Sequence, residues 1–322
     1  MDSISNVNTT SYTISGINQA DNFYISTAAG CDGNTERYSD TISNIYLDLN
    51  NPGNGTAVLQ WNDPILPGLS TMGNYYHIYR EYPSGNWILY DSVAFGSNSY
   101  IDTITVCEDS FNYQIVLPNT PCDYTSNIQG DVFQDNISPD IPIINFVTID
   151  TLNGAVTISW NQNNQDDTFG YIIYVKDSTG AIVELDNVFG IGTTSYTYNP
   201  DINDGPLTYS VAAFDSCWTS SIPPTYQTSA KGDIHSSVFL NTNLNICSRQ
   251  VELFWTPYVG WIGSTEYTIL GNFGNGWIDY GNTSDTNFII DVIPGETYTF
   301  IINAKSENGQ ESFSNQNTLF IN

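Results

Sequence analysis

A short apolar strand that ends in tryptophan occurs three times in this sequence, at residues 57–61, 156–160 and 251–255. The tryptophans themselves, Trp61, Trp160 and Trp255, lie 99 and 95 residues apart. A period of roughly 100 residues is the length of one two-sheet β-sandwich domain. Because the chain has 322 residues, it is too long for a single sandwich, and we expect a tandem array.

Two further strand patterns recur after the tryptophan strands. The first is aromatic-rich and occupies residues 75–79, 171–175 and 267–270. The second begins with a tyrosine, and its copies start at Tyr24, Tyr113, Tyr209 and Tyr298, which are 89, 96 and 89 residues apart. We expect the repeated tryptophans and tyrosines to occupy core positions.

The copy that starts at Tyr24 has no tryptophan strand before it. We therefore expect residues 1–42 to be the C-terminal half of a truncated domain. Three whole domains are expected at residues 43–137, 138–233 and 234–322. The expected strands are short, alternate with period two and are separated by Gly, Asn, Asp and Pro, so the predicted fold class is all-β.

The charge balance excludes two classes of partner. Lys and Arg number 6 against 34 Asp and Glu, for a formal net charge of −28. Nucleic acids and anionic membrane surfaces both require clustered cations, and the cations here are scattered singly. No segment approaches about 20 apolar residues, so we expect no membrane insertion. A strongly acidic surface fits a salty or divalent-rich exterior.

Sites of chemistry are sparse in this sequence. His77 and His235 are the only histidines, and neither is tied to a nucleophile, so we expect no enzyme and no cofactor. Acidic loops at residues 165–167 and 201–204 could hold calcium through loop oxygens, although the usual calcium-loop spacing is absent. Trp87, Trp261 and Trp277 stand outside the repeated strand and are candidate binding aromatics, or else cover the sandwich edge.

Five cysteines suggest disulfides in an oxidising compartment, since no spacing typical of zinc occurs. Cys107 precedes the strand of Tyr113 and Cys122 follows it, and we interpret them as a bridge, with two free thiols as the alternative. Cys31 is left over. Its partner lies in the missing half-domain, or it is free.

The order of these patterns resembles the fibronectin type III fold. A tryptophan lies on the second strand, a tyrosine-rich third strand follows, and a Pro/Gly turn precedes the strand that starts with tyrosine. Residues 293–298 resemble the tyrosine corner of that fold, where the phenol bonds back to nearby backbone. The resemblance implies tandem fibronectin type III or immunoglobulin-like β-sandwiches arranged as beads on a string.

A narrower resemblance rests on residues 133–150 with Trp160, and on residues 213–217, 235–240, Cys247 and 253–261. These segments are similar to the tandem modules that precede the type IX secretion sorting domain of gliding-motility-associated surface proteins in Bacteroidota. The resemblance implies a bridge between Cys217 and Cys247 that staples two domains. It also implies a fragment, because no sorting domain follows and no export signal opens the chain.

We therefore expect a non-catalytic structural or adhesive segment of an extracellular or cell-surface protein, which spaces or presents other domains of the same long chain. The alternative is a module that binds a cell-surface glycan or protein, possibly as an accessory part of a secreted glycoside hydrolase.

Overall fold

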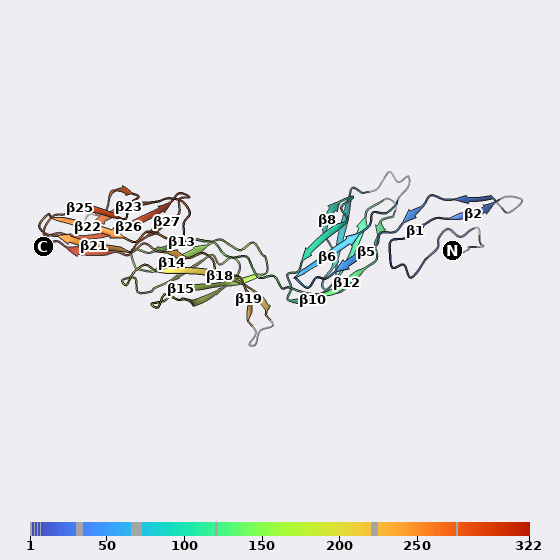
Figure 1. Cartoon of the computed structure of the whole chain (residues 1–322), viewed down its shortest axis with the longest axis horizontal. Coiled ribbons are helices and arrows are strands. Elements are labelled where there is room, and N and C mark those ends of the chain that lie inside the picture. The colour runs from blue at the N-terminus through green and yellow to red at the C-terminus, as the bar shows by residue number, and fades with distance from the viewer. Residues whose placement is uncertain are drawn as a thin grey trace. The chain divides into compact units, whose positions relative to one another are not determined.

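The chain is organised as two compact units, residues 1–137 and 138–322. The computed structural model describes residues 2, 4, 6, 8–29, 35–65, 73–119, 122–219, 225–274 and 276–322. Within these ranges the regular elements are β-strands (Figure 1). No helix in the described ranges is long and apolar enough to cross a membrane. The expectation of an all-β chain built from tandem β-sandwiches is confirmed.

The first unit begins with short antiparallel pairs and continues into a sandwich. The pairs are β1 (Asn22–Phe23) with β4 (Ile42–Ser43) and β2 (Ser26–Ala29) with β3 (Thr35–Tyr38).

Tyr24 does not occupy a core position, contrary to expectation. Its side chain is 51% exposed, and its ring meets Tyr38 edge-on at 5.6 Å. The position repeats the sequence pattern of the later tyrosine strands, but the described strands on either side of it, β1 and β2, each belong to a two-stranded sheet.

The sandwich of the first unit has a small sheet and a large sheet. The small sheet, in the order β5-β6-β9, consists of β5 (Leu47–Asn50), β6 (Thr56–Trp61) and β9 (Ser99–Thr103). The large sheet consists of β7 (Tyr75–Glu81), β8 (Trp87–Ala94), β10 (Glu108–Leu117), β11 (Tyr124–Thr125) and β12 (Gln129–Gln134). Its strand order is β11-β10-β7-β8, and β12 also pairs with β10.

The second unit holds two sandwiches with the same strand order (Figure 1). In the second sandwich the small sheet consists of β13 (Ile144–Ile149), β14 (Val156–Trp160) and β17 (Ser195–Tyr198), in that order. Its large sheet consists of β15 (Thr168–Lys176), β16 (Ile182–Phe189), β18 (Thr208–Trp218), β19 (Tyr226–Thr228) and β20 (His235–Ser236). The strand order is β16-β15-β18-β19, and β20 also pairs with β18.

The third sandwich repeats this arrangement. Its small sheet consists of β21 (Leu240–Asn245), β22 (Gln250–Trp255) and β25 (Asn287–Asp291). Its large sheet, β24-β23-β26-β27 with β28 on β26, consists of β23 (Thr265–Asn272), β24 (Trp277–Thr283), β26 (Thr297–Ser306), β27 (Glu311–Phe313) and β28 (Asn317–Phe320).

The tryptophan of each repeated strand lies between the two sheets of its sandwich. Trp61, Trp160 and Trp255 are 6%, 1% and 5% exposed and belong to three separate hydrophobic clusters. Period-two alternation explains this, because every second residue of a strand faces the other sheet. The indole N–H of each tryptophan finds no hydrogen-bond acceptor among the described residues. The position therefore depends on the volume of the ring and not on its polar group.

Three buried tyrosines on the long strands β10, β18 and β26 occupy one position but bond differently. Tyr113 donates to the Asp102 carboxylate at 2.7 Å, and the Tyr209 hydroxyl pairs with that of Tyr198 at 2.8 Å. Tyr298 accepts the backbone N–H of Ile293 at 3.2 Å, so the expected tyrosine corner is confirmed. Burial raises the pKa of Tyr113 and of Tyr209, which keeps both phenols neutral.

Tyr113 is part of a charged network inside the first sandwich. Arg80 donates to the same Asp102 carboxylate at 2.9 Å and stacks over the Tyr90 ring at 3.6 Å. The Asp102 side chain is 1% exposed and that of Arg80 is 15% exposed. Burial of both partners makes the pair sensitive to the loss of either one, because the remaining charge has no water to solvate it.

We expect Asp102→Ala to lower the unfolding free energy of the first unit by about 3–5 kcal/mol, since it strands the Arg80 guanidinium. Lys305→Ala is the control. It removes an ion pair with Glu311 whose side chains are about half exposed, and such a loss costs about 1 kcal/mol or less. Hydrogen exchange of the amides in β10 and β26 measures each effect in its own unit. Equal effects would contradict the buried network.

Candidate functional site

The outward face of the large sheet in the second sandwich carries an open hollow lined by aromatic side chains. Its volume is about 690 Å³. Phe189 ends β16, Phe214 lies near the end of β18, and Trp218 is the last residue of β18. Tyr226 begins β19, which pairs with β18 through Trp218. The sheet thus brings together residues that lie 37 positions apart in the chain.

The rings around the hollow pack against one another. Phe214 lies beneath them, 2% exposed, with Phe189 edge-on at 5.7 Å and Tyr226 at 5.1 Å. Trp218 lies over Tyr226 with 4.3 Å between ring centroids. Phe169 on β15 completes the cluster through its contact with Phe189 at 5.5 Å. Mutual ring contacts of this kind fix the side chains in one arrangement.

Polar groups form one side of the hollow. Asn187 donates its side-chain N–H to the Glu184 carboxylate at 2.8 Å, and both residues are exposed. Tyr174 lies beside them on the neighbouring strand. Burial, assisted by the nearby Glu184 charge, raises the pKa of the Tyr174 phenol. The Lys231 ammonium covers the Tyr174 ring at 4.2 Å and also donates to the Ile182 carbonyl.

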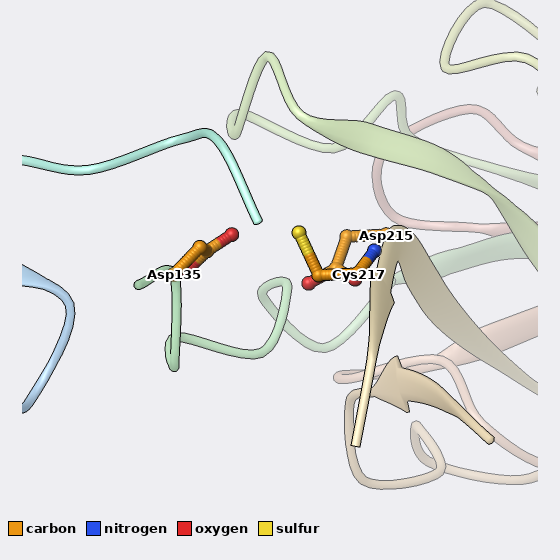
Figure 2. A group of neighbouring side chains, drawn as sticks. All are labelled: Asp135, Asp215 and Cys217. Atoms are coloured by element: carbon orange, nitrogen blue, oxygen red, sulfur yellow. The ribbon is translucent and has the colours of Figure 1, made fainter. Parts of the chain in front are cut away.

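Asp215 and Cys217 lie near the end of β18. Figure 2 shows the side chains of Asp215 and Cys217 as sticks. The Asp215 carboxylate accepts the backbone N–H of Cys217 at 2.7 Å. Cys217 is disulfide-bonded, so it has no thiolate to offer as a metal ligand. The acidic loop at residues 201–204 also bonds to itself, with Asn203 donating twice to Asp201. Calcium binding stays a prediction.

The two predicted cysteine pairs are wrong. Cys122 and Cys247 are exposed free thiols, whereas Cys107 and Cys217 are disulfide-bonded. Cys107 and Cys122 flank opposite ends of the ten-residue strand β10, which spans about 33 Å at 3.3 Å per residue. That distance is far beyond the reach of a disulfide. Cys31 lies outside the described residues.

The same geometry separates Cys217 from Cys247. β18 pairs with β20 at Thr208, where the chain leaves the second sandwich. Cys217 lies nine residues further along β18, about 30 Å away. Cys247 lies in the turn beyond β21 of the third sandwich. Both cysteines therefore lie far from the point where the chain passes from the second sandwich into the third.

Trp261 is not an exposed binding aromatic. Its indole N–H donates to the backbone carbonyl of Asn145 on β13 at 2.7 Å, and its ring stacks on Tyr258 at 3.7 Å. Trp261 thus joins the third sandwich to the second. Trp277 is 42% exposed on β24, and Trp87 is half-buried on β8.

Tyr258 is the centre of this junction. Its hydroxyl accepts the backbone N–H of Val147 at 2.9 Å and lies 2.9 Å from Nδ1 of His235. Because the Val147 N–H already donates to the phenol oxygen, the phenol proton is free to point at His235, whose Nδ1 accepts it when the ring is neutral. Burial lowers the pKa of His235 to about 4, although the Asp233 charge opposes the shift.

The far side of the junction uses β27. Ser312 donates its hydroxyl to the Val147 carbonyl at 2.6 Å, and the backbone N–H of Phe313 donates to the Thr148 hydroxyl at 2.9 Å. A hollow of about 630 Å³ lies between these strands, lined by Phe146 and Gln310 among others.

The sequence patterns did not indicate the aromatic hollow. Its rings come from four strands, β15, β16, β18 and β19, so no single segment is rich in them. One signal was available. Phe189 and Trp218 are the last residues of their strands and lie outside the alternation that fills the core, so their rings are left for the surface.

The comparisons with known proteins give little beyond this geometry. No protein-family model matches the chain, and no curated protein matches it. Among solved structures, the crystal structure of the FN1–FN3 domains of chicken CNTN1 aligns with a TM-score of 0.32 and 12% sequence identity. The alignment covers 86% of this chain and 98% of that chain. The fold assignment therefore rests on the strand pairing described above.

We expect the second unit to lose stability as the pH falls from about 6.5 toward 4. In that range the unfolded chain binds a proton at His235 and the folded chain does not, because its pKa is lowered to about 4. The unfolding free energy then decreases with falling pH, by about 2–3 kcal/mol in all. Chemical denaturation across this pH range measures the loss.

His235→Gln is the matched variant for this measurement. Glutamine keeps an acceptor for the Tyr258 hydroxyl and does not titrate. Its unfolding free energy should fall less steeply over the same pH range, while the carboxylates of the chain contribute equally to both proteins. Parallel pH profiles for the two proteins would show that His235 is not the group responsible.

Proposed function

We propose that this chain is a non-enzymatic extracellular segment in which the second and third sandwiches are held in one fixed orientation, so that it spaces or presents other parts of a longer protein. The observation that carries the proposal is the junction between these sandwiches. Side chains of the third sandwich bond to the backbone of β13, with Trp261, Tyr258 and Ser312 each supplying one contact. A flexible linker would leave that backbone exposed to water.

Two further observations support an extracellular location. Cys107 and Cys217 are disulfide-bonded, and such bonds persist in oxidising compartments. The net charge of −28 with only 6 cations favours a hydrated, self-repelling surface in a salt-rich medium. The resemblance of residues 235–240 and 253–261 supports a Bacteroidota surface protein exported by type IX secretion. Those two segments contain His235, Tyr258 and Trp261, which build the junction.

A glycine makes the close approach at the junction possible. Gly260 has a φ of +115°, and a Cβ at this position would lie 2.4 Å from the His235 ring. Gly281 has a φ of +122°, but a Cβ there would meet nothing within 4 Å. Alanine strains the backbone at both positions, whereas only at Gly260 does it also displace the His235 ring from Tyr258.

We expect spin labels on the two sandwiches to give a narrow distance distribution in the full chain. One label is carried by the exposed Cys247 and the other by Ser178→Cys on an exposed turn, with Cys31 and Cys122 replaced by serine. Gly260→Ala should broaden the distribution because it separates the interface. Pulsed electron–electron double resonance measures the distance distribution in the unmodified chain and in the variant.

Gly281→Ala is the control, since it introduces similar backbone strain in the same sandwich without a clash. It should leave the distribution narrow. A broad distribution in the unmodified chain would overturn the fixed orientation and with it the proposed spacing role.

A further inference from the structure

The aromatic hollow of the second sandwich leaves large rings in water. Phe189 and Trp218, which line the hollow, are 59% and 57% exposed. Phe169, which packs against Phe189, is 42% exposed. Isolated exposed apolar residues are ordinary, but several around one hollow mark an interaction site. The buried Phe214 beneath them holds the cluster in shape. The site is therefore formed before any ligand arrives, which lowers the entropy cost of binding.

The volume and lining of the hollow suit a small or oligomeric ligand. About 690 Å³ lies within the usual range of small-molecule sites, which combine apolar walls with a few placed polar groups. Here the walls are the rings of Trp218, Tyr226 and Phe189, and the polar groups are the Glu184 carboxylate and the Asn187 amide. The hydrogen bond between these last two holds both in place and leaves their remaining acceptor and donor sites available.

Sugars match this combination of surfaces. A pyranose ring has an apolar face of C–H groups, and these carry the slight positive charge that the face of an aromatic ring attracts. Its hydroxyls each donate and accept, so neighbouring hydroxyls can bond to a carboxylate and an amide side by side. Trp218 offers its exposed ring to the first kind of contact, and Glu184 with Asn187 offers the second.

Charge selects among sugars. The Glu184 side chain lines the hollow and the chain carries a net charge of −28, so a uronic or sulfated sugar would be repelled. Lys231 lies beside the hollow, because its ammonium covers the ring of Tyr174, which lines the hollow. That ammonium is already engaged with this ring and with the Ile182 carbonyl. We propose that the aromatic hollow bounded by Trp218, Phe189, Tyr226, Glu184 and Asn187 binds a neutral oligosaccharide.

The test uses the full chain and hexasaccharides of β-1,4-glucose, β-1,3-glucose, β-1,4-xylose, β-1,4-mannose and N-acetylglucosamine. Hexagalacturonate and decaproline are included as an acidic sugar and as a peptide that also favours aromatic grooves. Isothermal titration calorimetry gives the Kd of each. We expect at least one neutral hexasaccharide to bind, and neither hexagalacturonate nor decaproline to do so.

Variants locate the binding. Trp218→Ala should weaken the neutral hexasaccharide at least tenfold, which is the scale of a lost stacking contact of about 1.4 kcal/mol. Trp277→Ala is the matched control, because it removes an exposed tryptophan from the third sandwich, and Kd should change less than twofold. Circular dichroism checks that both variants stay folded. Glu184→Ala should weaken the same sugar, because it removes the acceptor for its hydroxyls.

Three results would overturn the proposal. They are no binding of any neutral hexasaccharide at millimolar concentration, sugar binding that survives Trp218→Ala in the folded chain, and binding of decaproline or hexagalacturonate in place of neutral sugars. None of these results bears on the distance measurement between the second and third sandwiches, so the spacing role and the sugar site stand or fall separately.

Discussion

The backbone of β13 is hydrogen-bonded on one side to β14 and on the other to side chains of the third sandwich. An edge strand normally presents unpaired N–H and C=O groups that attract foreign strands. Here the Val147 N–H, the Val147 carbonyl and the Asn145 carbonyl are all taken by Tyr258, Ser312 and Trp261. The same contacts close an exposed edge and fix the angle between two modules. These contacts with β13 explain the other features of the junction. They are the stacking of Tyr258 on Trp261, the neutral His235 and the positive φ of Gly260.

The repeated core positions keep the same large rings in all three sandwiches, but the hydrogen bonds of those rings differ from one sandwich to the next. Each sandwich buries one tryptophan whose N–H has no acceptor among the described residues, and one tyrosine whose hydroxyl has a different partner each time. The Asp102 carboxylate in the first sandwich, the Tyr198 phenol in the second and a backbone N–H in the third all satisfy the same hydroxyl. A repeat can therefore diverge in sequence around these rings, because each partner is local to its own sandwich.

The sequence predicted what depends on local periodicity and missed what depends on the path of the strands. The tryptophan strands and their spacing led directly to the sandwiches, because alternation determines which side chains face inward. The bridge between Cys107 and Cys122 was wrong because the ten-residue strand β10 separates the two cysteines. The bridge between Cys217 and Cys247, which the resemblance implied, was wrong because Cys247 is a free thiol. The sequence could not place Trp261 at the junction, because its acceptor, Asn145, lies 116 residues away. The aromatic hollow was missed for the same reason, since four strands contribute to it.

The contacts of the third sandwich with β13 have a mechanical consequence. The contacts of Ser312, Trp261 and Tyr258 with β13 lie outside the ladder that joins β13 to β14. They can therefore break without disturbing any strand pairing within either sandwich. When tension is applied through the chain, we expect the second and third sandwiches to part as folded bodies before either one unravels, and to rejoin when the tension is released. An array with such junctions lengthens under load in reversible steps.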